Sequence, residues 1–200
     1  MASSPKDTSR SAGVSRRTLI ASGGALSAAA LIGPRPALAA KPRPEREPVQ
    51  AGDRMMLRDG PNKGKLLTPD MLETGANCIE AFPFDPASDT ERSRNRLNRV
   101  LALRLDPADM DEETRRYSAD GVLIYSAICT HQGCTIETWD AETQHLKCFC
   151  HLSEFAALNQ GAVRSGPARR QLPMVPVTLD ADGYVVAAGG FTAKPGGAKT

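Results

Sequence analysis

The feature that most constrains this chain is a cluster of cysteines and histidines in its second half. Four of the five cysteines and all three histidines lie between positions 129 and 151. They form two groups: CTHQGC, with Cys129, His131 and Cys134, and CFCH, with Cys148, Cys150 and His151. Thiolates combined with imidazoles are typical ligands of zinc or of an iron–sulfur cluster. The chain is therefore predicted to fold around a metal centre.

The spacing within the two groups separates four candidate ligands from two further cysteines. Each group contains one Cys–His pair, Cys-x-His in the first and Cys-x-x-His in the second, and sixteen residues separate the pairs. Cys134 and Cys150 are left over, one in each group. A structural zinc site would use the four paired residues and leave these two cysteines without a role.

Most of the chain around the two groups is predicted to form β-strands. Residues 121–128, GVLIYSAI, are a continuous apolar run of strand length, rich in β-branched and aromatic side chains. In residues 97–105, leucines occupy alternate positions from 101 onward. Residues 175–179 and 184–188 flank Asp182-Gly183, a pair typical of a hairpin turn.

Two short helices are expected to interrupt the strands. Thr68-Pro69 is typical of a helix start and precedes Met71-Leu72. Asp106-Pro107 is expected to open a second helix, which continues to Arg115-Arg116 with acidic residues first and basic residues last. That order suits the helix dipole, and Gly121 suits the end of the helix.

The N-terminal segment has the order of regions expected of an export signal. Residues 15–20, SRRTLI, contain Arg16-Arg17, and an uncharged run over 18–34 leads to the small-residue stretch at 37–40. This arrangement resembles a twin-arginine signal and predicts export to the periplasm or another extracytoplasmic compartment, with 1–39 removed. The alternative is an uncleaved anchor in the inner membrane through 18–34, whose 17 uncharged residues compare with about 20 for a comfortable span.

The charge of the chain argues against nucleic acid as a partner. Residues 1–39 contain five of the 25 basic and one of the 23 acidic residues, so the remainder has 20 basic and 22 acidic residues. It lacks the basic stripe with interleaved aromatic residues that is typical of nucleic-acid-binding proteins. One local group of arginines is interpreted as a solvated face: Arg92, Arg94, Arg96 and Arg99.

Taken together, the two groups resemble the boxes of Rieske iron–sulfur proteins, where a Cys-Thr-His-x-Gly-Cys loop faces a Cys-x-Cys-His-x-Ser loop. The resemblance implies an all-β fold, an antiparallel β-sandwich with a smaller cluster-binding subdomain and short helices in an insertion. The charged, proline-rich stretch KPRPEREP at 41–48 predicts a linker over 40–52. The resemblance also implies a Rieske domain over 53–190, with cluster-binding loops within 121–170. Residues 191–200 are expected to be a flexible tail.

The resemblance further implies a role for each residue of the two groups. A Rieske-type 2Fe-2S cluster would be bound by Cys129 and Cys148 on one iron and by His131 and His151 on the other. Cys134 and Cys150 would form a disulfide between the loops, which is typical of the higher-potential members. Ser153 would donate a hydrogen bond to a bridging sulfide.

Several residues depart from the family's pattern. Phe155 stands where high-potential members usually carry a tyrosine that donates a hydrogen bond to a ligand cysteine. Its missing hydroxyl is expected to lower the reduction potential, because hydrogen bonds to sulfur favour the reduced cluster. Phe149 replaces the usual proline and Leu152 the usual glycine. Gly166-Pro167-Ala168 resembles the start of the family's third loop, which covers the cluster, and Arg169 stands where that loop usually continues with another proline.

The resemblance implies electron transfer rather than stand-alone catalysis. The expected partner is a redox protein, namely cytochrome c, cytochrome b or a catalytic oxidoreductase subunit, together with quinol in one context. Three contexts stay open: the iron–sulfur subunit of a quinol–cytochrome c reductase, the small subunit of an arsenite-oxidase-like enzyme, and a free carrier. A zinc-stabilised binding module is the alternative of a different class. Cys78 and His145 lie outside both groups and are interpreted as a buried strand residue and a surface residue.

Overall fold

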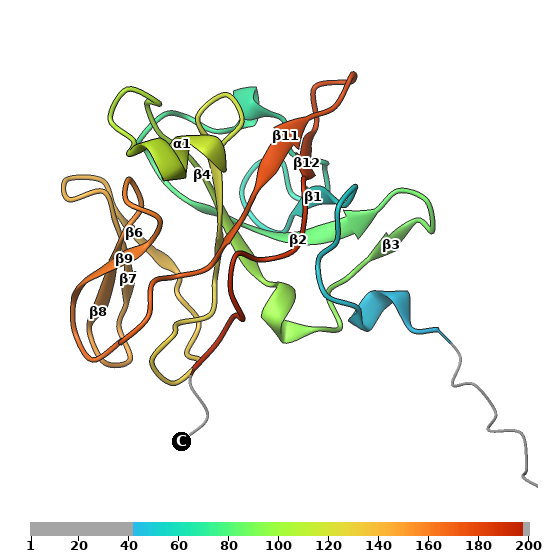
Figure 1. The fold of residues 1–200 in the computed structure, drawn as a ribbon. Helices are drawn as coiled ribbons and strands as arrows, with labels where there is room; N and C mark the ends of the chain where they lie inside the picture. The colour runs from blue at the N-terminus through green and yellow to red at the C-terminus, as the bar shows by residue number, and fades with distance from the viewer. Residues whose placement is uncertain (1–41, 198–200) are drawn as a thin grey trace, which may run out of the picture. The chain divides into compact units, whose positions relative to one another are not determined.

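The computed structural model describes residues 42–197, and the predicted signal or anchor over 1–39 lies outside the described residues. Two antiparallel sheets dominate this part of the chain (Figure 1), which confirms the all-β prediction. None of the helices within residues 42–197 has the length and apolar character that crossing a membrane requires.

The large sheet has eight strands. They are β1 (Arg54–Leu57), β2 (Ile79–Asp85), β3 (Thr90–Glu91), β4 (Val100–Arg104), β5 (Val122–Ser126), β10 (Met174–Val175), β11 (Val177–Leu179) and β12 (Val185–Ala187). The small sheet follows the order β6 (Thr138–Asp140), β7 (His145–Cys148), β8 (Ser153–Ala156) and β9 (Ala162–Ser165). The short helices are η1 (Pro44–Arg46), η2 (Pro69–Met71), η3 (Arg96–Asn98) and α1 (Glu112–Arg116).

One short segment joins the two ends of the large sheet and makes it barrel-like. The strand order is β10-β5-β4-β2-β1-β12-β11, with β3 paired to β2. Only Pro176 separates β10 from β11, yet β10 pairs with β5 and β11 pairs with β12. Proline has no N–H to donate, so it fits the point where the chain leaves one ladder for the next.

Strands β4 and β5 separate two hydrophobic cores. Leu101 and Leu103 face a core that includes the small sheet and Cys129, as the predicted alternation requires. Val100 and Ala102 face the second core, inside the large sheet. All four side chains are at most 3% exposed, and burial of each large aliphatic side chain contributes about 1.5–3 kcal/mol.

The predicted hairpin and the first predicted helix are confirmed. Strands β11 and β12 flank Asp182-Gly183, and Gly183 has φ +81°, a left-handed conformation that glycine adopts without strain. The first predicted helix is the 3-10 helix η2, which begins at Pro69.

The second predicted helix has wrong limits. It begins at Glu112 rather than near Pro107, because Asp106 accepts a hydrogen bond from the N–H of Ala108 and forms a separate turn. Asp111 is the actual N-cap and accepts from the N–H of Thr114 at 2.7 Å. Gly121 does not end this helix; it lies directly before β5 with φ +79°.

The interpretation of the arginines as a solvated face is wrong for Arg92 and Arg99. Arg92 is 4% exposed and donates to Asp53 at 2.8 Å and to the carbonyl of Pro44 at 3.0 Å. Arg99 pairs with Glu80. Through Arg92, part of the predicted linker over 40–52 is attached to the large sheet.

Candidate metal centre

Two loops carry the candidate ligands. Loop 1, residues 127–137, connects β5 to β6, and loop 2, residues 149–152, connects β7 to β8. Loop 1 turns back on itself, because the N–H of Cys129 donates to the carbonyl of Cys134 at 2.8 Å and that of Gly133 to the carbonyl of Cys129 at 3.0 Å. Gly133 has φ +77°, which this tight turn requires.

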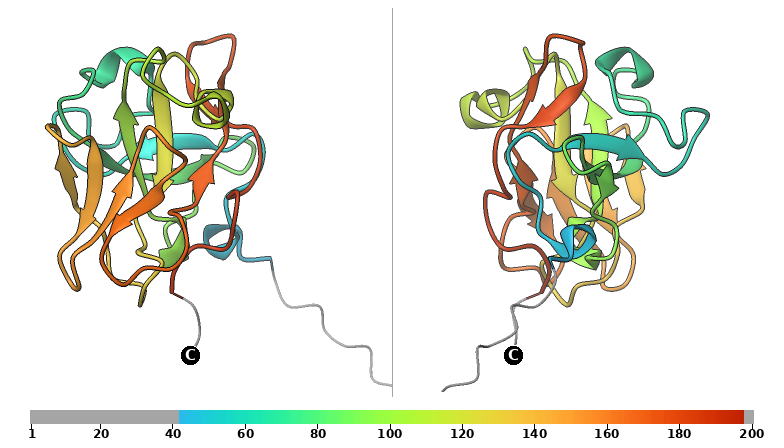
Figure 2. Two further views of the ribbon diagram at one scale, coloured as in Figure 1. Left: turned by 60° about the vertical axis from the view of Figure 1, so that its left-hand side comes forward. Right: turned by 90° about the vertical axis from the view of Figure 1, so that its right-hand side faces the viewer.

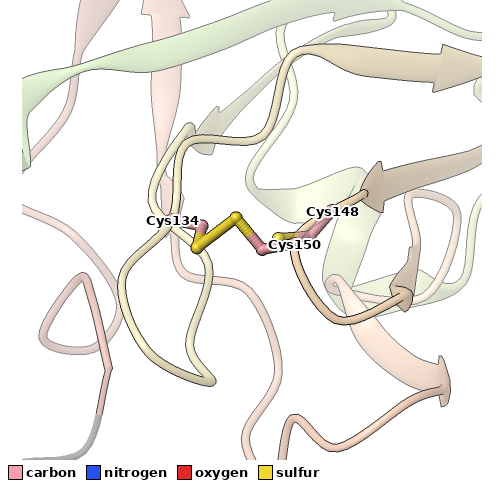
Figure 3. A group of neighbouring side chains, drawn as sticks. All are labelled: Cys134, Cys148 and Cys150. Atoms are coloured by element: carbon pink, nitrogen blue, oxygen red, sulfur yellow. A yellow bond between two sulfur atoms is a disulfide. The ribbon is translucent and has the colours of Figure 1, made fainter.

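A disulfide between Cys134 and Cys150 joins the two loops (Figure 3), which confirms the predicted pairing. Their Cα atoms are 6.5 Å apart. The sulfur of Cys148 lies within 4.8 Å of both disulfide sulfurs. A sulfur bonded to sulfur is no thiolate ligand, so only Cys148 of these three can bind a metal.

Cys129 and Cys148 are free thiols and each is 1% exposed. Burial raises the pKa of Cys129 to about 11, and the neighbouring Cys148 thiol adds to the rise. The backbone N–H groups of His131 and Gln132 act against it, because they donate to the Cys129 sulfur. Such donors stabilise a thiolate once a metal has displaced its proton.

His131 and His151 bring two imidazoles together from different loops. Their ring centroids are 4.7 Å apart and the rings are nearly perpendicular, at 85°. Nδ1 of His131 is buried and has no hydrogen-bond partner among residues 42–197. An unpaired buried nitrogen costs about 1–3 kcal/mol, which coordination of a metal would recover. The donor set of two thiols and two imidazoles therefore fits a 2Fe-2S cluster.

Burial differs sharply between the two kinds of ligand. The thiols lie in the core that contains Leu146 and Phe155, whereas His151 is exposed and His131 half-buried. A metal group held by all four would have a buried cysteine side and an outward histidine side.

Residues around loop 2 connect it to the third predicted loop. Ser153 is fully buried, and its Oγ accepts a hydrogen bond from the N–H of Ala168 at 3.2 Å, which leaves its own proton to donate. Leu152, at the family's glycine position, has φ +60°, a conformation that is uncommon for a side chain other than glycine. Phe149 and Leu152 are each 67% exposed.

Several contacts hold loop 1 in place that the sequence did not predict. The guanidinium of Arg96 donates twice to the carbonyl of Gly133, at 3.0 and 2.6 Å. Thr130 donates to the carbonyl of Arg170 at 2.6 Å, and Arg170 in turn donates to the carbonyl of Gly196 at 2.7 Å. These partners lie 26 to 40 positions apart, and no local pattern marks them.

The cysteine and the histidine that lie outside both sequence groups also lie outside the centre. His145 is on β7, half-buried, with Nδ1 3.2 Å from a carboxylate oxygen of Glu154. Cys78 is partly buried next to β2, and burial raises its pKa to about 11.

The chain is similar to known Rieske proteins. The model of the Rieske [2Fe-2S] domain matches residues 109–176. The cytochrome bc1 complex Rieske iron-sulfur subunit of Streptomyces lividans is 35% identical over 133 residues, which are 65% of this chain and 78% of that protein. The protein of the same name from Corynebacterium glutamicum is 36% identical over 62% of this chain and 32% of its own length.

A further relative and one solved structure extend the comparison. The subunit of the same name from Mycobacterium tuberculosis is 29% identical over 75% of this chain and 38% of that protein. This chain thus spans less than two fifths of the Corynebacterium and Mycobacterium relatives. The soluble domain of the Rieske protein II (soxF) from Sulfolobus acidocaldarius gives a TM-score of 0.36 at 24% identity, over 48% of this chain and 65% of that one.

The comparisons agree with the geometry of the two loops. The family match covers both boxes, and the disulfide, the free thiols and the paired imidazoles lie inside it. The cofactor that they indicate is a Rieske-type 2Fe-2S cluster. The chain belongs to the Rieske iron–sulfur protein family.

Proposed function

We propose that the chain is an electron-transfer protein whose 2Fe-2S cluster is bound by Cys129, Cys148, His131 and His151. The observation that carries this proposal is the meeting of two buried free thiols and two facing imidazoles across loops joined by a disulfide. When bound, such a cluster accepts and donates one electron at a time.

The burial of the four side chains supports a division of labour. Cys129 and Cys148, at 1% exposure, would hold the inner iron in the core. His131 and His151 would hold the outer iron and form the exit for the electron, because they lie nearer to solvent.

The respiratory setting is part of the proposal. The relatives named above are subunits of cytochrome bc1 complexes, which favours cytochrome b, cytochrome c and quinol as partners of this chain. The small subunit of another oxidoreductase and a free carrier are the other contexts.

Localisation and domain limits rest on the sequence. The N-terminal motif supports export by the twin-arginine route, with the Rieske domain over 53–190 on the extracytoplasmic side of the inner membrane. Residues 1–39 would be a signal peptide or an uncleaved anchor, and 40–52 the linker that follows it.

Spectroscopy with ligand variants tests the cluster. The purified protein should be coloured, and when reduced it should give an electron paramagnetic resonance signal with average g of about 1.9. His151→Ser should abolish this signal. His145→Asn, in the histidine outside the centre, is the matched control and should retain it. A colourless protein that contains zinc would overturn the assignment in favour of a zinc-stabilised module.

A further inference from the structure

A recess of about 1020 Å³ adjoins His131. Its walls come from η3, loop 1, the third loop and the C-terminal segment, residues 191–197. In Figure 1 the C-terminal segment, dark red, runs down beside the loops at the lower end of the domain, and Figure 2 shows the same end from two further sides. A hydrogen bond from Arg170 to the carbonyl of Gly196 attaches this segment to the third loop.

The lining of the recess is strongly basic. Arg96, Arg169, Arg170 and Lys194 all contribute to it, and no aspartate or glutamate does. Among residues 42–197, none of these four cations lies within ion-pair distance of a carboxylate, whereas Arg54, Arg58, Arg92, Arg99 and Arg104 each do. The chain from residue 40 onward carries a net charge of −2, so the recess is a local exception.

Two of the four cations are held in place. Arg96 donates to the carbonyl of Gly133, and Arg170 to the carbonyls of Lys194 and Gly196. A carbonyl oxygen holds a guanidinium group in position without neutralising its charge. The guanidinium groups of Arg96 and Arg170 therefore stay positively charged and fixed in the wall of the recess. Arg169 and Lys194 are exposed at the rim. Arg169 is also the residue that replaces the family's proline.

We propose that this basic recess is the docking site for an acidic face of the protein that accepts the electron. Carboxylates are the groups that unpaired guanidinium and ammonium groups attract. Because His131 forms part of the wall, an acceptor docked there lies against an outward ligand of the cluster. The proposal rests on the proposed electron-transfer function and names the chemistry of its partner.

The docking proposal is tested with two forms of cytochrome c that carry opposite surface charges. Native cytochrome c is basic, and succinylation converts its lysines into carboxylates without changing the haem. Binding of the cluster-containing protein to each form is measured by calorimetry at low and high salt. Wild type should prefer the succinylated form, and the preference should shrink at about 0.5 M salt, where the Debye length is only about 4 Å.

Charge reversal at the rim supplies the test variant. Arg169→Glu with Lys194→Glu should weaken binding of the succinylated form about tenfold or more at low salt. Lys63→Glu with Lys65→Glu makes the same change in net charge at exposed positions outside the recess, and should change binding less than about twofold. Similar losses in both double variants would overturn the proposal, because net charge alone would explain them.

Electron transfer gives a second readout. The reduced protein should reduce succinylated cytochrome c faster than the native form, and the rim variant should reverse that order. Ferricyanide, a small inorganic anion, serves as a second oxidant of the reduced protein. If the rim variant is oxidised more slowly by ferricyanide but its reactions with both forms of cytochrome c are unchanged, the recess binds small anions only and the docking proposal fails. Loss of the proposed function is distinguishable, because the cluster signal would then be absent before any partner is added.

Discussion

Phe155→Tyr is expected to raise the reduction potential of the cluster. Cys148 pairs with Ser153 across the small sheet, and Phe155 follows Ser153 by two residues. Paired residues and residues two apart lie on the same face of a sheet, so all three side chains share one buried face. A hydroxyl on the ring of residue 155 would therefore lie on the cysteine side of the site and can donate to a ligand sulfur.

The size of the shift follows from the strength of that hydrogen bond. A hydrogen bond to a charged group contributes about 1.5–3 kcal/mol, and only the part that differs between the oxidised and reduced cluster changes the potential. A difference of about 1–1.5 kcal/mol corresponds to about +45 to +65 mV for one electron, because 59 mV is a tenfold change in the equilibrium constant. Phe155 is fully buried, so the added oxygen should also cost about 1 kcal/mol of stability.

Protein-film voltammetry measures the change directly. Phe149→Tyr is the matched control, because Phe149 belongs to loop 2 but is 67% exposed and has no place in the buried face. Its potential should stay within about 10 mV of wild type. An unchanged potential in Phe155→Tyr, with the cluster spectrum intact, would refute the reasoning, as would equal shifts in both variants.

Three further predictions concern stability, each measured as the free energy of unfolding in urea. Arg92→Met leaves Asp53 buried without its cation and should lower the free energy of unfolding by about 3–5 kcal/mol. The control Arg94→Met, at an exposed position, should lower it by less than about 0.5 kcal/mol. Equal losses in the two variants would contradict this prediction. The double variant Cys134→Ser with Cys150→Ser removes the disulfide, whose cysteines have a sequence separation of 16, and should lower the free energy of unfolding by about 3 kcal/mol. A decrease of less than about 1 kcal/mol would show that the disulfide contributes little to stability. The pKa of Asp111 is lowered, because hydrogen bonds from Thr114 and Asn159 outweigh the opposing effect of burial. A lowered pKa stabilises the fold above the unfolded value of about 3.9, and that stability is lost as pH falls through the folded value. Asp111→Asn should therefore make the free energy of unfolding depend less on pH below about pH 4. Asp109→Asn, at an exposed position, should leave that pH dependence unchanged.

The candidate centre could be predicted from the sequence because its chemistry is local. Each box places a thiol and an imidazole within four residues, and two such boxes contain the donors that one cluster needs. The pairing of Cys134 with Cys150 followed from the resemblance, and the structure contains it. The exposure of His151 and the burial of the thiols were not visible in the spacing, because burial depends on which strands pack around the loops.

The misplaced start of α1 shows how local signals can compete. Asp106-Pro107 and Asp111 are both typical of a helix start, and the earlier one is favoured by its proline. Contacts from distant residues support the later start: the N–H of Asp111 donates to the carbonyl of Leu158 at 3.0 Å, and Asn159 donates to its carboxylate at 3.4 Å.

By itself, the sequence determined the strand character of the chain, the hairpin at Asp182-Gly183 and the types of ligand in the two loops. These depend on residues that are close along the chain, whose conformations and donor atoms are set by their own chemistry. Only the tertiary structure decided how the large sheet closes at Pro176, which arginines are buried, and that residues 96, 131, 170 and 194 line one basic recess. The physical reason is that ion pairs, burial and recesses arise between segments far apart in sequence, and the folded packing selects their partners.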